Sequence, residues 1–116
     1  MSKTRTLEKL AKLVFAVSSE AEFFAYATSP QIRDSIDWSG FKRSAETDSR
    51  PFPSLRPILG RITVCLDALR TCRAPVLSKS TPSRILFSDA NPCHTHFCEL
   101  KKEVEAFKRE FQRLSL

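Results

Sequence analysis

Apolar residues recur every three or four positions along the C-terminal part of the chain. This spacing places them on one stripe of an α-helix, in the heptad pattern that holds a helix against a partner surface. Asn91 is suited to cap this helix, with Pro92 at its first position. The pattern predicts a long amphipathic helix from Asn91 to Leu114. Its stripe consists of Phe97, Leu100, Val104, Phe107, Phe111 and Leu114.

Two earlier segments show the same helical period. Leucine and valine residues line one face of Thr4 to Val17, and a longer apolar stripe runs through Ser54 to Arg73. Both segments are therefore predicted to be amphipathic helices. Gly60 lies inside the second helix and weakens it by about 1 kcal/mol relative to alanine. We interpret its presence as a sign that another helix approaches closely there.

Shorter elements are expected between these helices. Ser19 and Glu22 have the spacing of a capping box, which predicts that a second helix starts there unless the first runs through. A proline at the first position and Gly40 beyond the end predict a short helix over Pro30 to Trp38. The apolar run after Pro82 fits either one or two helical turns or a short strand, and periodicity does not decide between them.

The segment 39–53 is polar and shows no apolar period, so we interpret it as a mobile loop. The chain has 116 residues and only two glycines. This length predicts a single helical domain over residues 1–116, and so few glycines argue against a β-rich fold with many tight turns. The predicted fold class is all-α, a small irregular bundle of four or five helices with a long C-terminal amphipathic helix.

The chain is basic, with a net charge of +6. The surplus is largest in the middle of the chain, where arginine dominates, and arginine suits bidentate contact with phosphate. This distribution predicts a nucleic-acid-binding accessory protein as an alternative function. The residues that would contact phosphate are Lys42, Arg43, Arg56, Arg61, Arg70 and Arg73.

Four cysteines are present, and the N-terminus lacks the features of a secretory signal peptide. We therefore expect free thiols in a reducing intracellular compartment, the cytoplasm or the nucleus. The basic amphipathic segment Thr4 to Val17 also fits a mitochondrial presequence or a membrane-surface helix, although packing on the core is the simpler interpretation. No apolar run is long enough for a transmembrane helix.

Cysteine and histidine cluster between Cys93 and Cys98. His94 and Cys98 are four positions apart, so they share one face of the predicted helix and could chelate a zinc ion together. Cys65 or Cys72 would have to complete such a site, but both lie on an apolar stripe and are better explained as buried core thiols. A small zinc-stabilised helical module is therefore a further alternative, and zinc is the only cofactor suggested.

The sequence contains no evident catalytic constellation. As a nucleophile, Cys93 would benefit from the positive end of the helix dipole. The sequence identifies neither an orienting group nor an oxyanion site for it. We therefore expect that the protein is not an enzyme, and we infer no small-molecule substrate.

The C-terminal stripe has two candidate uses, packing inside its own bundle or binding a protein partner. With Phe97 at heptad position a, Glu103 would face Lys108 of a second copy in a parallel homodimer. The leading functional prediction is a non-enzymatic interaction protein or regulatory adaptor that presents a helical surface to a protein partner. Self-association through the C-terminal helix is one form of this prediction.

Overall fold

The structure, a computed structural model, describes residues 3–26, 38–75, 79–80 and 82–115. Of the helix predicted over Pro30 to Trp38, only Trp38 is among them. The elements within these ranges are α1 (Lys3–Ala25), α3 (Ser39–Asp48), α4 (Arg56–Thr71), the 3-10 helix η1 (Ser83–Phe87) and α5 (Pro92–Ser115). No strand occurs in the described ranges. The structure thus confirms the all-α fold class and the long C-terminal helix.

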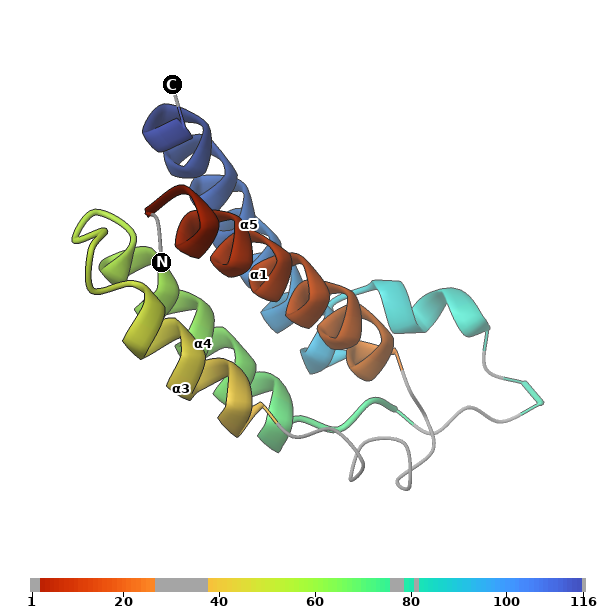
Figure 1. Cartoon of the computed structure of the whole chain (residues 1–116). Coiled ribbons are helices and arrows are strands. Elements are labelled where there is room, and N and C mark those ends of the chain that lie inside the picture. Colours follow the sequence, from red (N-terminus) through yellow and green to blue (C-terminus); the bar gives the residue numbers. More distant parts are fainter. Residues whose placement is uncertain (1–2, 27–37, 76–78, 81, 116) are drawn as a thin grey trace.

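The α-helices form a bundle in which α5 has a central place. It lies along α1 on one side and along α4 on the other, while α3 packs against α1 and α4 (Figure 1). Ring contacts show that α1 and α5 run in opposite directions, because Phe15 pairs with Phe107 and Tyr26 pairs with Phe97. The start of α1 and the end of α5 therefore meet at one end of the bundle.

One buried cluster joins all four α-helices. Its enclosed side chains are mostly aliphatic or aromatic. Burying one such side chain stabilises the fold by about 1.5–3 kcal/mol. Most members of this cluster belong to the apolar stripes of α1, α4 and α5. The largest enclosed apolar side chains are Phe24, Phe107, Leu10, Leu55, Ile62, Leu66, Leu69 and Leu100.

Helix α1 continues past Ser18 and Ser19 as one helix. Of the two predicted alternatives, a second helix starting at Ser19 or a first helix that runs through, the structure has the second. Its buried face continues from Val17 to Ala21 and Phe24, at steps of four and three residues. Ser19 is exposed, so it interrupts the polar face and not the apolar stripe. Since serine costs a helix only a few tenths of a kcal/mol, packing of the stripe carries the helix past this point.

The predicted mobile loop is wrong for most of its length, because α3 occupies it. Only Phe41 and Ala45 of this helix are buried, and two positions make too short a stripe to stand out as a period. Trp38, directly before α3, is also buried, and its ring packs edge-on against Phe24 at a centroid distance of 5.0 Å. Tertiary contacts therefore stabilise a helix that its own pattern does not predict.

The helix predicted over Ser54 to Arg73 is confirmed as α4, with a proline in its first turn. The interpretation of Gly60 is corrected. Gly60 is exposed, and a Cβ atom placed on it would meet no atom within 4 Å. Among the described elements, no other helix therefore approaches this glycine closely enough to require the absence of a side chain.

The apolar run after Pro82 forms η1, so the helical alternative is right and the strand alternative is wrong. Leu86 is buried, whereas the next residue, Phe87, is exposed. A 3-10 helix of this length contributes few hydrogen bonds of its own. Its position therefore depends on the contacts it makes with the ends of α1 and α5.

Asn91 holds these three elements together, and its side chain is fully buried. Its Oδ1 accepts the backbone N–H of Cys93 at 3.1 Å, which caps α5 as predicted. Its Nδ2 donates to the carbonyl of Ala25, the last residue of α1, at 3.2 Å and to the carbonyl of Leu86 at 2.8 Å. One side chain therefore satisfies three polar backbone groups of the end of α1, η1 and the start of α5.

Candidate functional site

The predicted partner-binding stripe of α5 lies mostly in the protein's own core. A side chain buried among its own helices cannot present the same surface to a partner in this fold. In this structure the stripe therefore packs inside the bundle, the other of its two candidate uses, and its use by a partner stays a prediction. Phe97, Leu100, Val104 and Phe107 are at most 5% exposed, and Phe111 and Leu114 are partly buried against the same core.

The charged residues that would have paired across a homodimer also have partners within the chain. Glu103 accepts from Arg61 of α4 at 2.5 Å. Lys108 lies 3.1 Å from Glu105 and 5.6 Å from the centre of the Phe15 ring. The Arg61–Glu103 pair links α4 to α5, and the contact of Lys108 with the Phe15 ring links α5 to α1. The heptad charge pattern is thus explained inside one copy of the chain.

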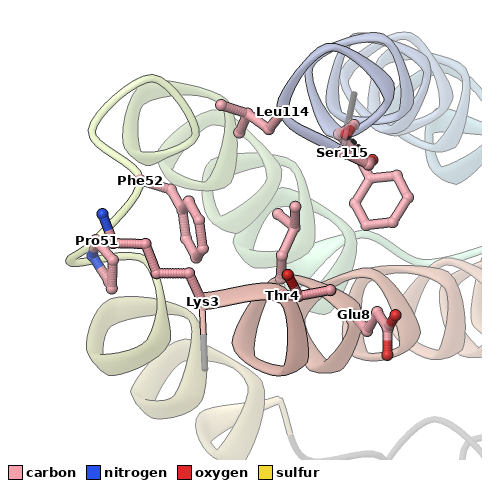
Figure 2. A pocket seen from close by; sticks show the side chains of 9 residues that line it. Lys3, Thr4, Glu8, Pro51, Phe52, Leu114 and Ser115 are labelled. Atoms are coloured by element: carbon pink, nitrogen blue, oxygen red, sulfur yellow. Dashed lines mark hydrogen bonds between the residues drawn. The ribbon is translucent and has the colours of Figure 1, made fainter. Parts of the chain in front are cut away.

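A cavity of about 410 Å³ opens where the start of α1 meets the end of α5. Figure 2 shows Phe52 and Leu114 on either side of this space, with Lys3 extending toward Pro51. Its lining combines apolar side chains of the core edge with polar groups of the first turns of α1. The full lining is Lys3, Thr4, Leu7, Glu8, Pro51, Phe52, Phe111, Leu114 and Ser115.

Two of the six basic residues of the nucleic-acid alternative, Lys42 and Arg61, are engaged in ion pairs, and Arg61 faces away from Arg56. Lys42 of α3 pairs with Asp67 at 2.5 Å, and Arg61 is engaged by α5 through its pair with Glu103. At about 100° per residue, Arg61 lies about 140° around α4 from Arg56. This separation counts against binding driven by phosphate contacts, which needs several cations on one surface. The remaining members, Arg43, Arg56, Arg70 and Arg73, are exposed.

Two phenylalanine side chains are strongly exposed near the end of α1. Phe23 and Phe87 each leave 60% of their surface in contact with solvent. Tyr26 follows Phe23 by three residues, about one helical turn, and its ring stacks on Phe87 at a centroid distance of 4.5 Å. We call Phe23, Tyr26 and Phe87 the aromatic patch. Exposed aromatic side chains are typical of interaction surfaces.

Tyr26 also begins a chain of polar contacts that leads to Cys98. Its hydroxyl lies 2.8 Å from Nδ1 of His94. The Cys98 sulfur lies 3.6 Å from Nε2 of His94 and 4.0 Å from Nδ1. Burial raises the pKa of the Tyr26 phenol, and negative charge on Cys98 and Glu22 adds to the rise. The hydroxyl is therefore protonated at neutral pH and available for hydrogen bonding.

The structure thus brings together the two residues predicted as metal ligands, His94 and Cys98. A structural zinc site has four ligands. Within the part of the chain that the structure describes, no three histidine, cysteine, aspartate or glutamate side chains converge. Cys65, which was considered as a further ligand, lies in the core on α4. His94 and Cys98 therefore contact each other, and His94 contacts Tyr26. Among the described residues, no third metal ligand joins them.

The other cysteines are less accessible or lie elsewhere. Cys93, the nucleophile considered from its place at the start of the helix, is fully buried. Cys65 is buried as expected, and burial raises the pKa of its thiol, with a further rise from the charges of Glu99 and Glu103. Cys72, expected in the core, is partly buried at its edge. Cys98 and Cys72 are thus the more accessible thiols.

Sequence reasoning missed the aromatic patch, although one signal for it exists. The stripe of α1 passes through Ala21 and Phe24, so Phe23 falls on the polar face of the same helix. A large aromatic residue at a polar position is the feature that could have identified the patch. The role of Tyr26 had no such signal, because its contacts come from residues more than sixty positions away.

The apolar face of α1 is buried in the bundle, with Leu10 and Val14 fully enclosed. Its packing on the core, the simpler of the interpretations of this segment, is the one found. Across the described residues, no helix combines the length and the hydropathy that crossing a membrane requires.

Comparisons with known proteins give no family assignment. No protein-family model matches the chain, and neither the curated proteins nor the solved structures contain a match.

Proposed function

We propose that the protein is a non-enzymatic interaction module or adaptor that binds a protein partner through the aromatic patch. The observation that carries this proposal is the exposure of Phe23 and Phe87, 60% each, on a chain that otherwise buries its large apolar stripes. Exposed aromatic side chains that fold stability does not require are expected to serve recognition.

Two rings of the patch, Tyr26 and Phe87, are held in place before any partner arrives. Phe87 stacks on Tyr26, and the Tyr26 ring packs edge-on against Phe97 of the core at 5.9 Å. The Tyr26 hydroxyl is fixed by His94 at 2.8 Å. Side chains that are already ordered lose little conformational entropy on binding. A partner that covers Phe23 and Phe87 would gain about 1.5–3 kcal/mol for each ring that it buries fully.

The charges around the patch favour a protein partner over a nucleic acid or a membrane. Glu22 precedes Phe23 in α1, and Arg84 lies one turn of η1 before Phe87, both exposed. A rim with both signs of charge is typical of protein interfaces. Phosphate-rich partners require a surplus of cations on one surface. The exposed rings and the mixed charges beside them therefore favour another protein, with an apolar surface, as the partner that covers the patch.

A photocrosslinking experiment tests the proposal. A benzophenone amino acid is placed at position 23, at position 87 and, as a matched control, at position 64. Val64 is 68% exposed on α4 and lies outside the patch. In cells that produce the protein, positions 23 and 87 should crosslink one common protein and position 64 should not. The affinity for that protein should then fall at least about tenfold in Phe23→Ser and Phe87→Ser.

The same experiment can contradict the proposal. Equal crosslinking from position 64, or an affinity that Val64→Ser lowers as much as Phe23→Ser, would show that the patch is not the binding surface. Crosslinking to a second copy, together with a doubled mass in light scattering, would identify self-association through the patch. Salt separates the nucleic-acid alternative, because phosphate binding weakens steeply as salt rises and apolar contact does not.

A further inference from the structure

The cavity where the start of α1 meets the end of α5 is large enough for a small ligand. Its volume of about 410 Å³ lies within the range of about 300–1,000 Å³ that is usual for small-molecule sites. Leu7 of α1 and Phe52, which lies between α3 and α4, are buried and form part of its wall. Phe111 and Leu114 of α5 line it as well, and Figure 2 shows Leu114 across the space from Phe52. Apolar side chains from three parts of the chain thus surround one space.

The apolar stripe of α5 is incompletely covered at this end of the bundle. Its first four members are buried, whereas Phe111 and Leu114 are only partly buried. A ligand with an apolar tail would cover the rest of their surface. Each methylene group that such a tail buries strengthens binding by about fourfold. The uncovered end of the stripe therefore favours an apolar tail as one part of the ligand.

The polar groups of the cavity come from the first turns of α1. Of the residues that line it, Lys3 alone is cationic and Glu8 alone is anionic. Figure 2 shows these two side chains on opposite sides of Thr4. The Lys3 ammonium and the Thr4 hydroxyl are both hydrogen-bond donors, so together they suit a carboxylate. Glu8 would repel a second negative charge, which favours a ligand with a single carboxylate.

We propose that this cavity binds a medium-chain fatty acid as its carboxylate. The tail lies against Leu7, Phe52 and Leu114, and the carboxylate accepts hydrogen bonds from Lys3 and Thr4. The volume is near the lower end of the usual range, so it fits a medium chain better than a long one.

This ligand site is separate from the aromatic patch of the proposed function. Both sites involve α1, but Lys3 stands at its start and Phe23 near its end. At 1.5 Å per residue, about 30 Å of helix axis separates the two positions. A ligand of this size in the cavity therefore does not reach the patch.

Titration of the intact protein with octanoate, followed by amide NMR shifts, tests the proposal. Shifts are expected at Thr4, Phe52 and Leu114 and not at Phe23 or Phe87. Hexanoate, which is two methylene groups shorter, should bind about tenfold more weakly. Octylammonium has the same tail with the opposite charge. It should bind about fivefold more weakly than octanoate, because Lys3 repels it.

A charge reversal tests the role of Lys3 as the partner of the carboxylate. Lys3→Glu should weaken octanoate binding by about fivefold and strengthen octylammonium binding. Lys12→Glu is the matched control, because Lys12 is exposed on the same helix but does not line the cavity. It should leave both affinities within about twofold of the wild type. A merely structural role of Lys3 would not reverse the preference between the two probes.

A second pair of variants tests the cavity itself. Ser115 lines the cavity and is exposed, so Ser115→Trp would place a large ring in or across this space without removing a buried apolar side chain. We expect it to weaken octanoate binding by at least about tenfold. Gln112→Trp, at an exposed position of α5 outside the lining, should not. Circular dichroism shows whether each variant keeps the helical content of the wild type.

Three results would overturn the proposal. The first is a set of octanoate shifts that extends equally over the aromatic patch, and the second is equal affinity for octanoate and octylammonium. The third is unchanged octanoate binding in folded Lys3→Glu and Ser115→Trp. If octanoate caused no shift while the crosslinked protein partner shifted Thr4 and Leu114, the cavity would belong to a protein interface and the fatty-acid proposal would be wrong. No protein partner is needed for the octanoate titration, so its failure leaves the proposed interaction function untouched.

Discussion

Phenylalanine occupies opposite environments at the α5 stripe and at the aromatic patch. Phe107 of the stripe is fully buried, whereas Phe23 and Phe87 of the patch are 60% exposed. Phe107 pairs with the rings of Phe15 and Phe111 from two helices. Phe87 stacks on Tyr26. The difference shows that residue type does not decide the role of a phenylalanine. A ring that lies on the apolar stripe of its helix contributes to folding, whereas a ring that lies off the stripe is available for binding.

The sharpest way to break this comparison is to remove a ring from the core. Phe107→Ala should lower the free energy of unfolding by about 3–5 kcal/mol, because the substitution loses buried apolar surface and leaves a cavity. Urea denaturation followed by helical circular dichroism measures the loss. A change below about 1 kcal/mol would show that the stripe is not the core that the structure describes.

The next largest effect is expected at Asn91, which joins the core to the η1 side of the patch. Asn91→Asp keeps the acceptor that caps α5 but removes the amide donor to the carbonyls of Ala25 and Leu86. It also directs a carboxylate at those two oxygens. We expect a loss of about 2 kcal/mol in the free energy of unfolding.

Asn91→Ala, which removes the cap as well, is the matched comparison. If the aspartate variant kept the full stability of the wild type while the alanine variant did not, the cap alone would account for the role of Asn91. The bridge to α1 and η1 would then contribute nothing measurable.

A smaller effect of opposite sign is expected at Gly60, which belongs to neither aromatic region. Gly60→Ala should raise the free energy of unfolding by about 1 kcal/mol, because alanine is the better helix former and the added Cβ meets nothing within 4 Å. Gly40→Ala, in the first turn of α3, should gain less. Thermal unfolding of the two variants measures both changes in stability. A destabilised Gly60→Ala would point to a contact that the structure does not contain.

The smallest change in stability is expected at the patch itself. Phe23→Ser should alter the free energy of unfolding by no more than about 0.5 kcal/mol, because an exposed ring contributes little to folding. Phe87→Ser should cost no more than about 1 kcal/mol, because it also loses the stacking on Tyr26. Denaturation curves within these limits, combined with the tenfold loss of partner affinity, would complete the separation of folding from binding. A loss of more than about 2 kcal/mol in Phe23→Ser would instead make that ring part of the core.

Much of the fold could be predicted because it depends on local periodicity. The stripes of α4 and α5, and the cap of α5 by Asn91, were readable from residue spacing and match the helices found. The continuous α1 was one of two alternatives, since only Ala21 bridges its stripe. Helix α3 was missed because Phe41 and Ala45 alone face the core.

The candidate sites were less predictable than the fold. The pair His94 and Cys98 followed from helical spacing, but the third member, Tyr26, comes from the other end of the chain. The stripe proposed as a partner surface was correctly identified as apolar, yet spacing alone cannot say which neighbour covers it. The basic residues likewise looked like one group in the sequence, whereas in the structure Lys42 is paired with Asp67 and Arg61 is paired with Glu103.

The sequence by itself determined the helical class and the apolar faces of α4 and α5, because the helical repeat is a property of neighbouring residues. Only the tertiary structure decided that the α5 stripe is core, that Phe23 and Phe87 stay exposed, and that Tyr26 meets His94. The physical reason is that burial and side-chain contacts depend on which helices lie side by side. That arrangement arises from contacts between residues far apart in the chain, which no local pattern records.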